Sequence, residues 1–195
     1  MNICVYGASS DVIDKEYVLA GEKLGEEMAR RGHVLIFGGG AEGLMGAVAR
    51  GMSRGSGKII GVAPSFFEVD GVLYDKCTEF VYTDTMRVRK QIMEERSDAF
   101  IMTPGGVGTF EEFFEILTLK QLNRHQKAIA VLNVLNYFDD ITALMEHAAN
   151  GGFMKPESMS LYRFFTDTGK MLDYIEGYKP HEVNLKDMKH INTKR

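Results

Sequence analysis

The chain has 195 residues, of which 45% are hydrophobic and 26% are charged, and its formal net charge is −4. This composition is ordinary for a soluble globular protein, and the length suits one α/β domain with a substantial core. The negative charge argues against a nucleic-acid partner bound by phosphate neutralisation. No apolar run is long enough to span a bilayer, so no membrane partner is expected either.

The two cysteines and the first residues indicate a compartment. Cys4 and Cys77 lie far apart, without a CxxC pair or a Cys/His cluster. A reduced cytosolic chain therefore fits better than a disulfide scaffold, and no metal site is predicted. The opening MNICVYGASS lacks the basic leader and long apolar run of a signal peptide, so we expect a cytoplasmic location.

Strand and helix patterns alternate along the chain. Apolar runs predict strands at residues 2–6, 33–37, 58–62, 78–82, 99–102, 128–133 and 161–165. Helical spacing predicts helices at residues 17–31, 109–122, 137–150 and 169–176, and another that begins at about residue 44. A further helix is predicted to end at residue 96 and to begin at a cap that is either Asp84 or Thr85. Residues 64–76 are predicted to form a loop.

This alternation predicts an α/β fold of the Rossmann-like, doubly wound type, with a mainly parallel sheet and helices on both faces. We assign residues 1–177 to a single nucleotide-binding domain. Residues 178–195 are polar and are expected to form a loosely held C-terminal tail.

Three turns rich in glycine or serine follow predicted strands, at residues 7–10, 38–43 and 104–108. Ligands of doubly wound sheets bind beyond the carboxyl ends of the strands, so we expect the turns to converge on a nucleotide-like ligand. Gly38, Gly40 and Gly43 satisfy GxGxxG, but no Asp or Glu ends the next strand. Dinucleotide binding is therefore disfavoured, the P-loop pattern is absent, and a mononucleotide phosphate held by backbone amides is favoured.

The turn at residues 104–108 is the centre of the predicted site. Its glycines remove Cβ atoms where a ligand or another backbone must come close, and the helix behind it offers free N–H groups to an anion. Glu111 and Glu112 lie in the first turn of that helix, at the mouth of the pocket. Thr109 and Glu112 also match a capping box, so a structural role for Glu112 stays open.

Arg89 shares a helix face with Met86 and thus lies within an apolar stripe. An unpaired buried cation is costly, so Arg89 needs an anionic partner. That partner is either a structural carboxylate, Glu112 or Asp98, or a substrate phosphate, which suits the planar guanidinium. The neighbouring Lys90 can add a point charge.

The helix predicted from residue 110 to 122 is apolar nearly all round its surface. A helix that is apolar on more than one face is buried on more than one face. One face can cover the sheet, and the other is expected to meet a second copy of the chain in a homodimer whose interface lies near the site. A wholly intrachain core is the alternative.

These motifs together resemble the LONELY GUY (LOG) family of cytokinin riboside 5′-monophosphate phosphoribohydrolases, often labelled lysine decarboxylase-like. The family's PGGxGTxxE matches residues 104–112, its Arg-Lys pair matches Arg89 and Lys90, and its GGGxxGLMG matches residues 38–46. The resemblance covers about residues 1–175. It implies a Rossmann-like fold, usually a dimer, and hydrolysis of the N-glycosidic bond of N6-modified adenosine monophosphates to free base and ribose 5-phosphate, without cofactor or metal.

The resemblance also implies roles for individual residues. Arg89 and Glu112 would be the catalytic pair, with Glu112 near C1′ stabilising an oxocarbenium-like state or activating water, and Arg89 holding phosphate and geometry. The substrate-binding residues would be Gly7, Ser9, Gly39, Gly40, Gly43, Met45, Met86, Lys90, Pro104, Gly105, Gly106, Val107, Gly108, Thr109 and Glu111.

Two departures from the family concern the base. Arg87 and Val88 stand where a polar pair such as His-Glu usually precedes Arg-Lys, and Leu119 replaces a tryptophan. Plain AMP or a related nucleotide therefore stays open as the substrate. Two other functions also stay open: a non-catalytic carrier of a nucleotide or molybdopterin-type cofactor, which the presence of both Arg89 and Glu112 disfavours, and a pyridoxal-phosphate decarboxylase, for which no suitable lysine is seen.

Overall fold

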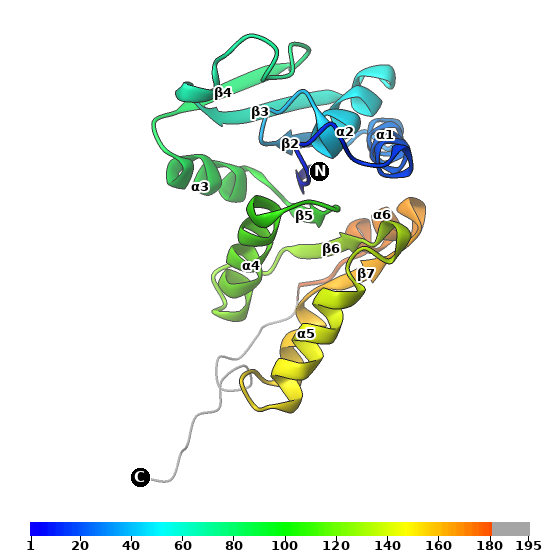
Figure 1. Ribbon diagram of the computed structural model, residues 1–195, viewed down its shortest axis with the longest axis vertical. Coiled ribbons are helices and arrows are strands. Elements are labelled where there is room, and N and C mark those ends of the chain that lie inside the picture. The colour runs from blue at the N-terminus through cyan, green and yellow to red at the C-terminus, as the bar shows by residue number, and fades with distance from the viewer. Residues whose placement is uncertain (181–195) are drawn as a thin grey trace.

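The computed structural model describes residues 1–180, and a seven-stranded parallel sheet forms the centre of this part of the chain (Figure 1). The strands are β1 (Asn2–Tyr6), β2 (Val34–Phe37), β3 (Lys58–Pro64), β4 (Glu79–Thr83), β5 (Ala99–Met102), β6 (Ala128–Leu132) and β7 (Arg163–Phe165). Their order is β4-β3-β2-β1-β5-β6-β7. The order reverses between β1 and β5, where the chain returns from the edge to the middle of the sheet.

Helices cover both faces of the sheet, which confirms the predicted doubly wound α/β fold. They are α1 (Lys15–Arg30), α2 (Gly43–Arg54), α3 (Met86–Arg96), α4 (Val107–Gln121), α5 (Asp139–Asn150) and α6 (Thr168–Glu176). Helices α1, α2 and α6 pack on one face, and α3, α4 and α5 pack on the other (Figure 1). No helix among residues 1–180 has the length and apolar character needed to cross a bilayer.

The core consists of two apolar layers, one on each side of the sheet. Side chains alternate between the layers along each strand, so in β1 Ile3 and Val5 face α1 and α2 while Cys4 and Tyr6 face α3 and α4. Because both faces are covered, β1 and β5 read as continuous apolar runs, which is the pattern of central parallel strands. The turns that follow these two strands therefore rest on the most buried part of the sheet.

Most predicted boundaries lie within two residues of the observed ones. One difference matters for the site: α4 begins at Val107, with Gly106 as its N-cap and no side-chain cap. Thr109 therefore lies inside the helix, and the predicted capping box with Glu112 is wrong. Of the two predicted N-cap residues of α3, Asp84 and Thr85, the structure uses Thr85, whose hydroxyl oxygen accepts the Val88 N–H at 3.2 Å.

The connection from β3 to β4 also departs from the alternation of strand and helix. Residues 65–78 cross over between these parallel strands with only a short 3₁₀ helix (Ser65–Phe67). Long loops without regular structure inside a compact domain are commonly functional. Most of the expected polar tail, residues 181–195, lies outside the described residues.

Candidate active site

A cavity of about 720 Å³ lies at the carboxyl ends of β1, β2, β3 and β5. It therefore sits where the strand order reverses, the position at which doubly wound sheets bind ligands. The cavity brings together these predicted site residues: Gly7, Ser9, Gly40, Met45, Met86, Arg89, Gly106, Val107, Gly108, Thr109, Glu111 and Glu112. Residues from three separate turns and from α2, α3 and α4 thus line one cavity.

Five predicted binding residues lie outside the cavity lining: Gly39, Gly43, Lys90, Pro104 and Gly105. Gly39 and Gly43 shape their turn, because their φ values of +80° and +62° favour glycine. Gly105 permits the close packing of the turn, since a Cβ there would overlap the Thr109 hydroxyl oxygen. The carbonyl of Pro104 accepts the Ala8 N–H at 3.0 Å. Gly39, Gly43, Pro104 and Gly105 therefore shape the turns that carry the cavity lining.

Sequence reasoning missed one side of the cavity. Residues Phe67, Gly71, Val72 and Leu73, in the segment predicted only as a loop, line it. Ala8, Ser10, Gly38 and Glu42 line it as well; they belong to predicted turns but were not named as binding residues. The available signal was the pair of phenylalanines at 66 and 67 in a segment where polar residues are usual.

Arg89 and Glu112 form a buried ion pair on the cavity wall. Arg89 Nη1 donates to Glu112 Oε1 at 2.8 Å, and Arg89 Nε donates to the Val62 carbonyl at 3.0 Å, near the end of β3. The two residues are only 6% and 7% exposed. A methyl group on Gly38 would overlap Arg89 Nη2, so the glycine leaves the guanidinium its place.

The other predicted carboxylate partner, Asp98, is not the one that Arg89 contacts. Its side chain accepts the backbone N–H of Asn2 at 2.7 Å, at the opposite end of β5. Glu112 thus has both a structural and an accessible position: it forms an ion pair with Arg89, and it also lines the cavity.

The pKa of the Glu112 carboxyl is raised above its ordinary value. Burial is the main cause, and it outweighs the adjacent Arg89 guanidinium, which acts to lower the pKa. A carboxyl group with a raised pKa holds a proton more readily near neutral pH, which suits general acid or base chemistry.

The N-terminus of α4 faces the cavity without a side-chain cap, so its first N–H groups have no partner within the helix. Gly106, Val107 and Gly108 are exposed there. A Cβ on Gly106 or Gly108 would meet no protein atom within 4 Å, in contrast to Gly105. These two glycines therefore keep space open in front of a helix end that attracts anions.

Charge around the cavity is mainly negative. Glu42, Glu111 and Glu112 line it, and Arg89 is the one cation among the described lining residues. Lys90 Nζ bonds to Glu111 and, at 2.9 Å, to Glu115. Burial lowers the pKa of Lys90, but these two carboxylates outweigh it and leave the pKa raised. Within residues 1–180 no group of three or more His, Cys, Asp or Glu side chains could hold a metal ion.

Comparison with known proteins adds independent findings. A family described as "Possible lysine decarboxylase" matches residues 45–175. The chain is 35% identical to a probable cytokinin riboside 5′-monophosphate phosphoribohydrolase, LOGL5, of Oryza sativa subsp. japonica over 178 residues, which cover 91% of this chain and 72% of that protein. It is 31% identical to the cytokinin riboside 5′-monophosphate phosphoribohydrolase LOG2 of Arabidopsis thaliana over 192 residues, covering 98% and 90%.

Solved structures show the same fold. The molybdenum cofactor binding protein from the phototrophic bacterium Rippkaea orientalis has a TM-score of 0.70 at 23% identity, over 90% of this chain and 94% of that one. The Moco carrier protein from Chlamydomonas reinhardtii has a TM-score of 0.67 at 20% identity, over 90% and 94%. At this level of identity the likeness concerns the fold alone.

Proposed function

The chain belongs to the LOG family of cytokinin riboside 5′-monophosphate phosphoribohydrolases, and from this membership we propose that it hydrolyses the N-glycosidic bond of adenosine 5′-monophosphates, N6-modified ones in particular. The products are the free base and ribose 5-phosphate. The observation that carries the proposal is the buried Arg89–Glu112 pair on the wall of a cavity at the reversal of strand order.

The phosphate of the substrate lies at the N-terminus of α4 in this proposal. The exposed N–H groups there and the open space in front of Gly106 and Gly108 suit an anion. Arg89 instead positions Glu112, since two of its nitrogens already bond to Glu112 and Val62. This differs from the phosphate-holding role that the resemblance implied for Arg89.

Glu112 carries the chemistry. In its ionised form the carboxylate takes a proton from a water molecule as the water oxygen bonds to C1′ of the ribose. The C1′–N bond breaks and its electron pair leaves with the base, and the proton taken up by Glu112 passes to the base nitrogen, so that Glu112 is ionised again. Positive charge that builds up on the sugar in the transition state is stabilised by the same carboxylate.

We further propose that the protein works as a cytoplasmic homodimer. Support for the dimer comes from exposed apolar side chains: Met86 of α3 and Val107 of α4 line the cavity, and Val88 of α3 is exposed as well. Apolar groups clustered near a site are typical of protein interfaces. The other apolar side chains of α4 are partly buried within the chain, because Phe110, Phe114 and Leu119 pack against the core layer on the α3, α4 and α5 side of the sheet.

The assay for this function is base release. Purified protein is incubated with AMP and with N6-isopentenyl-AMP, and free base is measured by chromatography together with ribose 5-phosphate. We expect equal amounts of both products. Tight nucleotide binding without base release would refute the hydrolase and favour the carrier function. The visible absorbance of bound pyridoxal phosphate would instead indicate a decarboxylase, although no lysine is among the described residues that line the cavity.

A further inference from the structure

Residues 65–73, called the β3 loop below, expose several apolar side chains beside the cavity. Phe66 and Phe67 contact each other with ring centroids 4.7 Å apart and are 60% and 40% exposed. Val69 and Val72 are 59% and 40% exposed. Exposed apolar clusters of this kind mark places where a ligand or partner binds. Phe67 and Val72 line the cavity, whereas Phe66 does not.

The second half of the β3 loop is anchored to the turn after β2. Leu73 pairs with Gly40 in an isolated antiparallel bridge. The Ala41 N–H donates to the Val72 carbonyl at 3.0 Å, and the Tyr74 N–H donates to the Gly39 carbonyl at 2.8 Å. Backbone hydrogen bonds on both sides of Leu73 therefore hold this wall at a defined place over the end of β2.

The charge of the β3 loop argues against a bound phosphate on the side of the cavity that this loop lines. Glu68 and Asp70 are exposed, and residues 65–75 contain no Lys or Arg. The N-terminus of α4 follows β5, three strands away from β3 across the sheet, or roughly 14 Å at the usual strand spacing. Arg89 lies between them, since it contacts both Val62 of β3 and Glu112 of α4. With phosphate at α4 and C1′ at Glu112, the base extends toward the β3 loop.

We propose that the cavity-lining part of the β3 loop, Phe67 and residues 71–73, is the base-side wall of the cavity and that Phe67 determines which exocyclic substituents the base can carry. This inference rests on the proposed function. The Phe67 ring, Val72 and Leu73 offer apolar surface without side-chain hydrogen-bonding groups, so burial favours an apolar substituent over a polar or absent one.

The test compares Phe67→Ala with Phe66→Ala, a matched change one residue away that does not touch the cavity lining. The ratio of kcat/KM for N6-isopentenyl-AMP to that for AMP is measured for each variant, with ribose 5-phosphate as a product inhibitor that lacks the base. Phe67→Ala is expected to lower the ratio about tenfold, mainly through KM, and to leave ribose 5-phosphate inhibition unchanged. Phe66→Ala should leave the ratio within about twofold of wild type.

An unchanged ratio in Phe67→Ala, or an equal fall in Phe66→Ala, would overturn the assignment while wild-type hydrolysis still supports the proposed function. If the wild-type protein releases no base, the proposed function fails. Equilibrium binding of the two intact nucleotides to wild type, Phe67→Ala and Phe66→Ala then tests whether the β3 loop contacts the base. Selective weakening of N6-isopentenyl-AMP binding by Phe67→Ala supports the assignment, and equal weakening of both nucleotides overturns it.

Discussion

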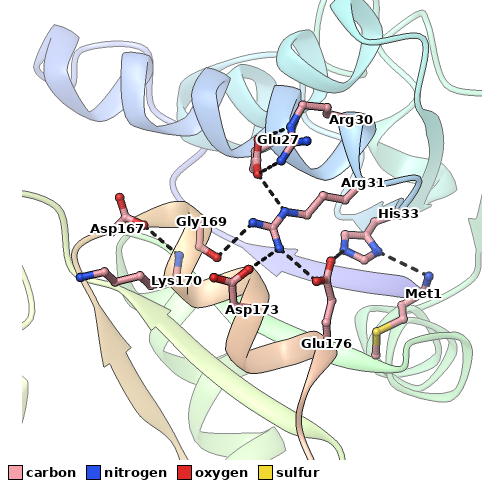
Figure 2. A network of polar contacts seen from close by, with 10 residues as sticks. All are labelled: Met1, Glu27, Arg30, Arg31, His33, Asp167, Gly169, Lys170, Asp173 and Glu176. Carbon is pink, nitrogen blue, oxygen red and sulfur yellow. Dashed lines mark hydrogen bonds and ion pairs between the residues drawn. The ribbon is translucent and has the colours of Figure 1, made fainter.

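Two arginine–carboxylate groups at opposite edges of the sheet show how much the surroundings of an ion pair matter. At the carboxyl edge, Arg89 and Glu112 are buried together on the cavity wall. At the other edge, Arg31 joins the end of α1 to α6 through bonds to Glu27 at 2.8 Å and Glu176 at 3.0 Å (Figure 2). His33 extends this second network, with Nε2 at 2.8 Å from Glu176.

The pKa of the glutamate moves in opposite directions in the two places. Hydrogen bonds from Arg30 and then Arg31 lower the pKa of Glu27 to about 2. Burial raises the pKa of Glu112 although Arg89 lies against it. An arginine partner therefore does not by itself make a carboxyl group acidic, because the loss of water around the pair can be the larger effect. The buried Arg89–Glu112 pair is therefore suited to proton transfer, and the second network, around Arg31, ties helices together.

Replacing the buried carboxylate should have the largest effect. Glu112→Gln is expected to lower kcat for base release by about 10²–10⁴-fold while most nucleotide affinity remains, because the amide cannot take a proton from water. Glu115→Gln is the matched control, since Glu115 lies on the same helix outside the cavity lining. Steady-state kinetics and nucleotide binding measure both. Wild-type turnover in Glu112→Gln would remove Glu112 from the mechanism.

Displacing Arg89 should lower kcat by less than the loss of Glu112 does. A methyl group in Gly38→Ala overlaps Arg89 Nη2, so the guanidinium must move away from its bonds to Glu112 and Val62. We expect kcat to fall about tenfold to a hundredfold, with a smaller change in KM. Gly177→Ala, at the end of α6, is the control and should leave kcat unchanged.

The pH profile separates this positioning effect from simple loss of structure. Ionised Glu112 is the active form, so activity falls as pH drops through a pKa above the ordinary glutamate value of 4.5. Arg89 acts to lower that pKa, so moving it in Gly38→Ala should shift the acid limb to still higher pH. An acid limb at the wild-type position in an otherwise slowed variant would contradict the role given to Gly38.

Weakening the second network should change stability and leave catalysis alone. Because the pKa of Glu27 is lower in the folded chain, its contribution to stability is present above about pH 4.5 and is lost as pH falls toward 2. Glu27→Gln is expected to lower the free energy of unfolding by about 1 kcal/mol at pH 7. Urea titrations at several pH values should show the difference shrinking in acid. A loss of base release in this variant would mean that the two networks are coupled.

Local patterns in the sequence determined the fold class and most of the parts of the site. Apolar periodicity of two or about 3.6 residues and the glycine turns depend on neighbours in the chain, so they placed the strands, the helices and the turns after β1, β2 and β5. They also singled out Arg89 and Glu112 as residues that need an explanation.

Only the tertiary structure decided how these parts meet. Arg89 and Glu112 lie 23 positions apart, and they touch because β5 is inserted beside β1, which brings α4 against α3. The same arrangement places the β3 loop on the cavity, packs Gly105 against Thr109, and buries Glu112 deeply enough to raise its pKa. Burial and contact through space depend on strand order, and strand order is set by the whole chain rather than by any single stretch of it.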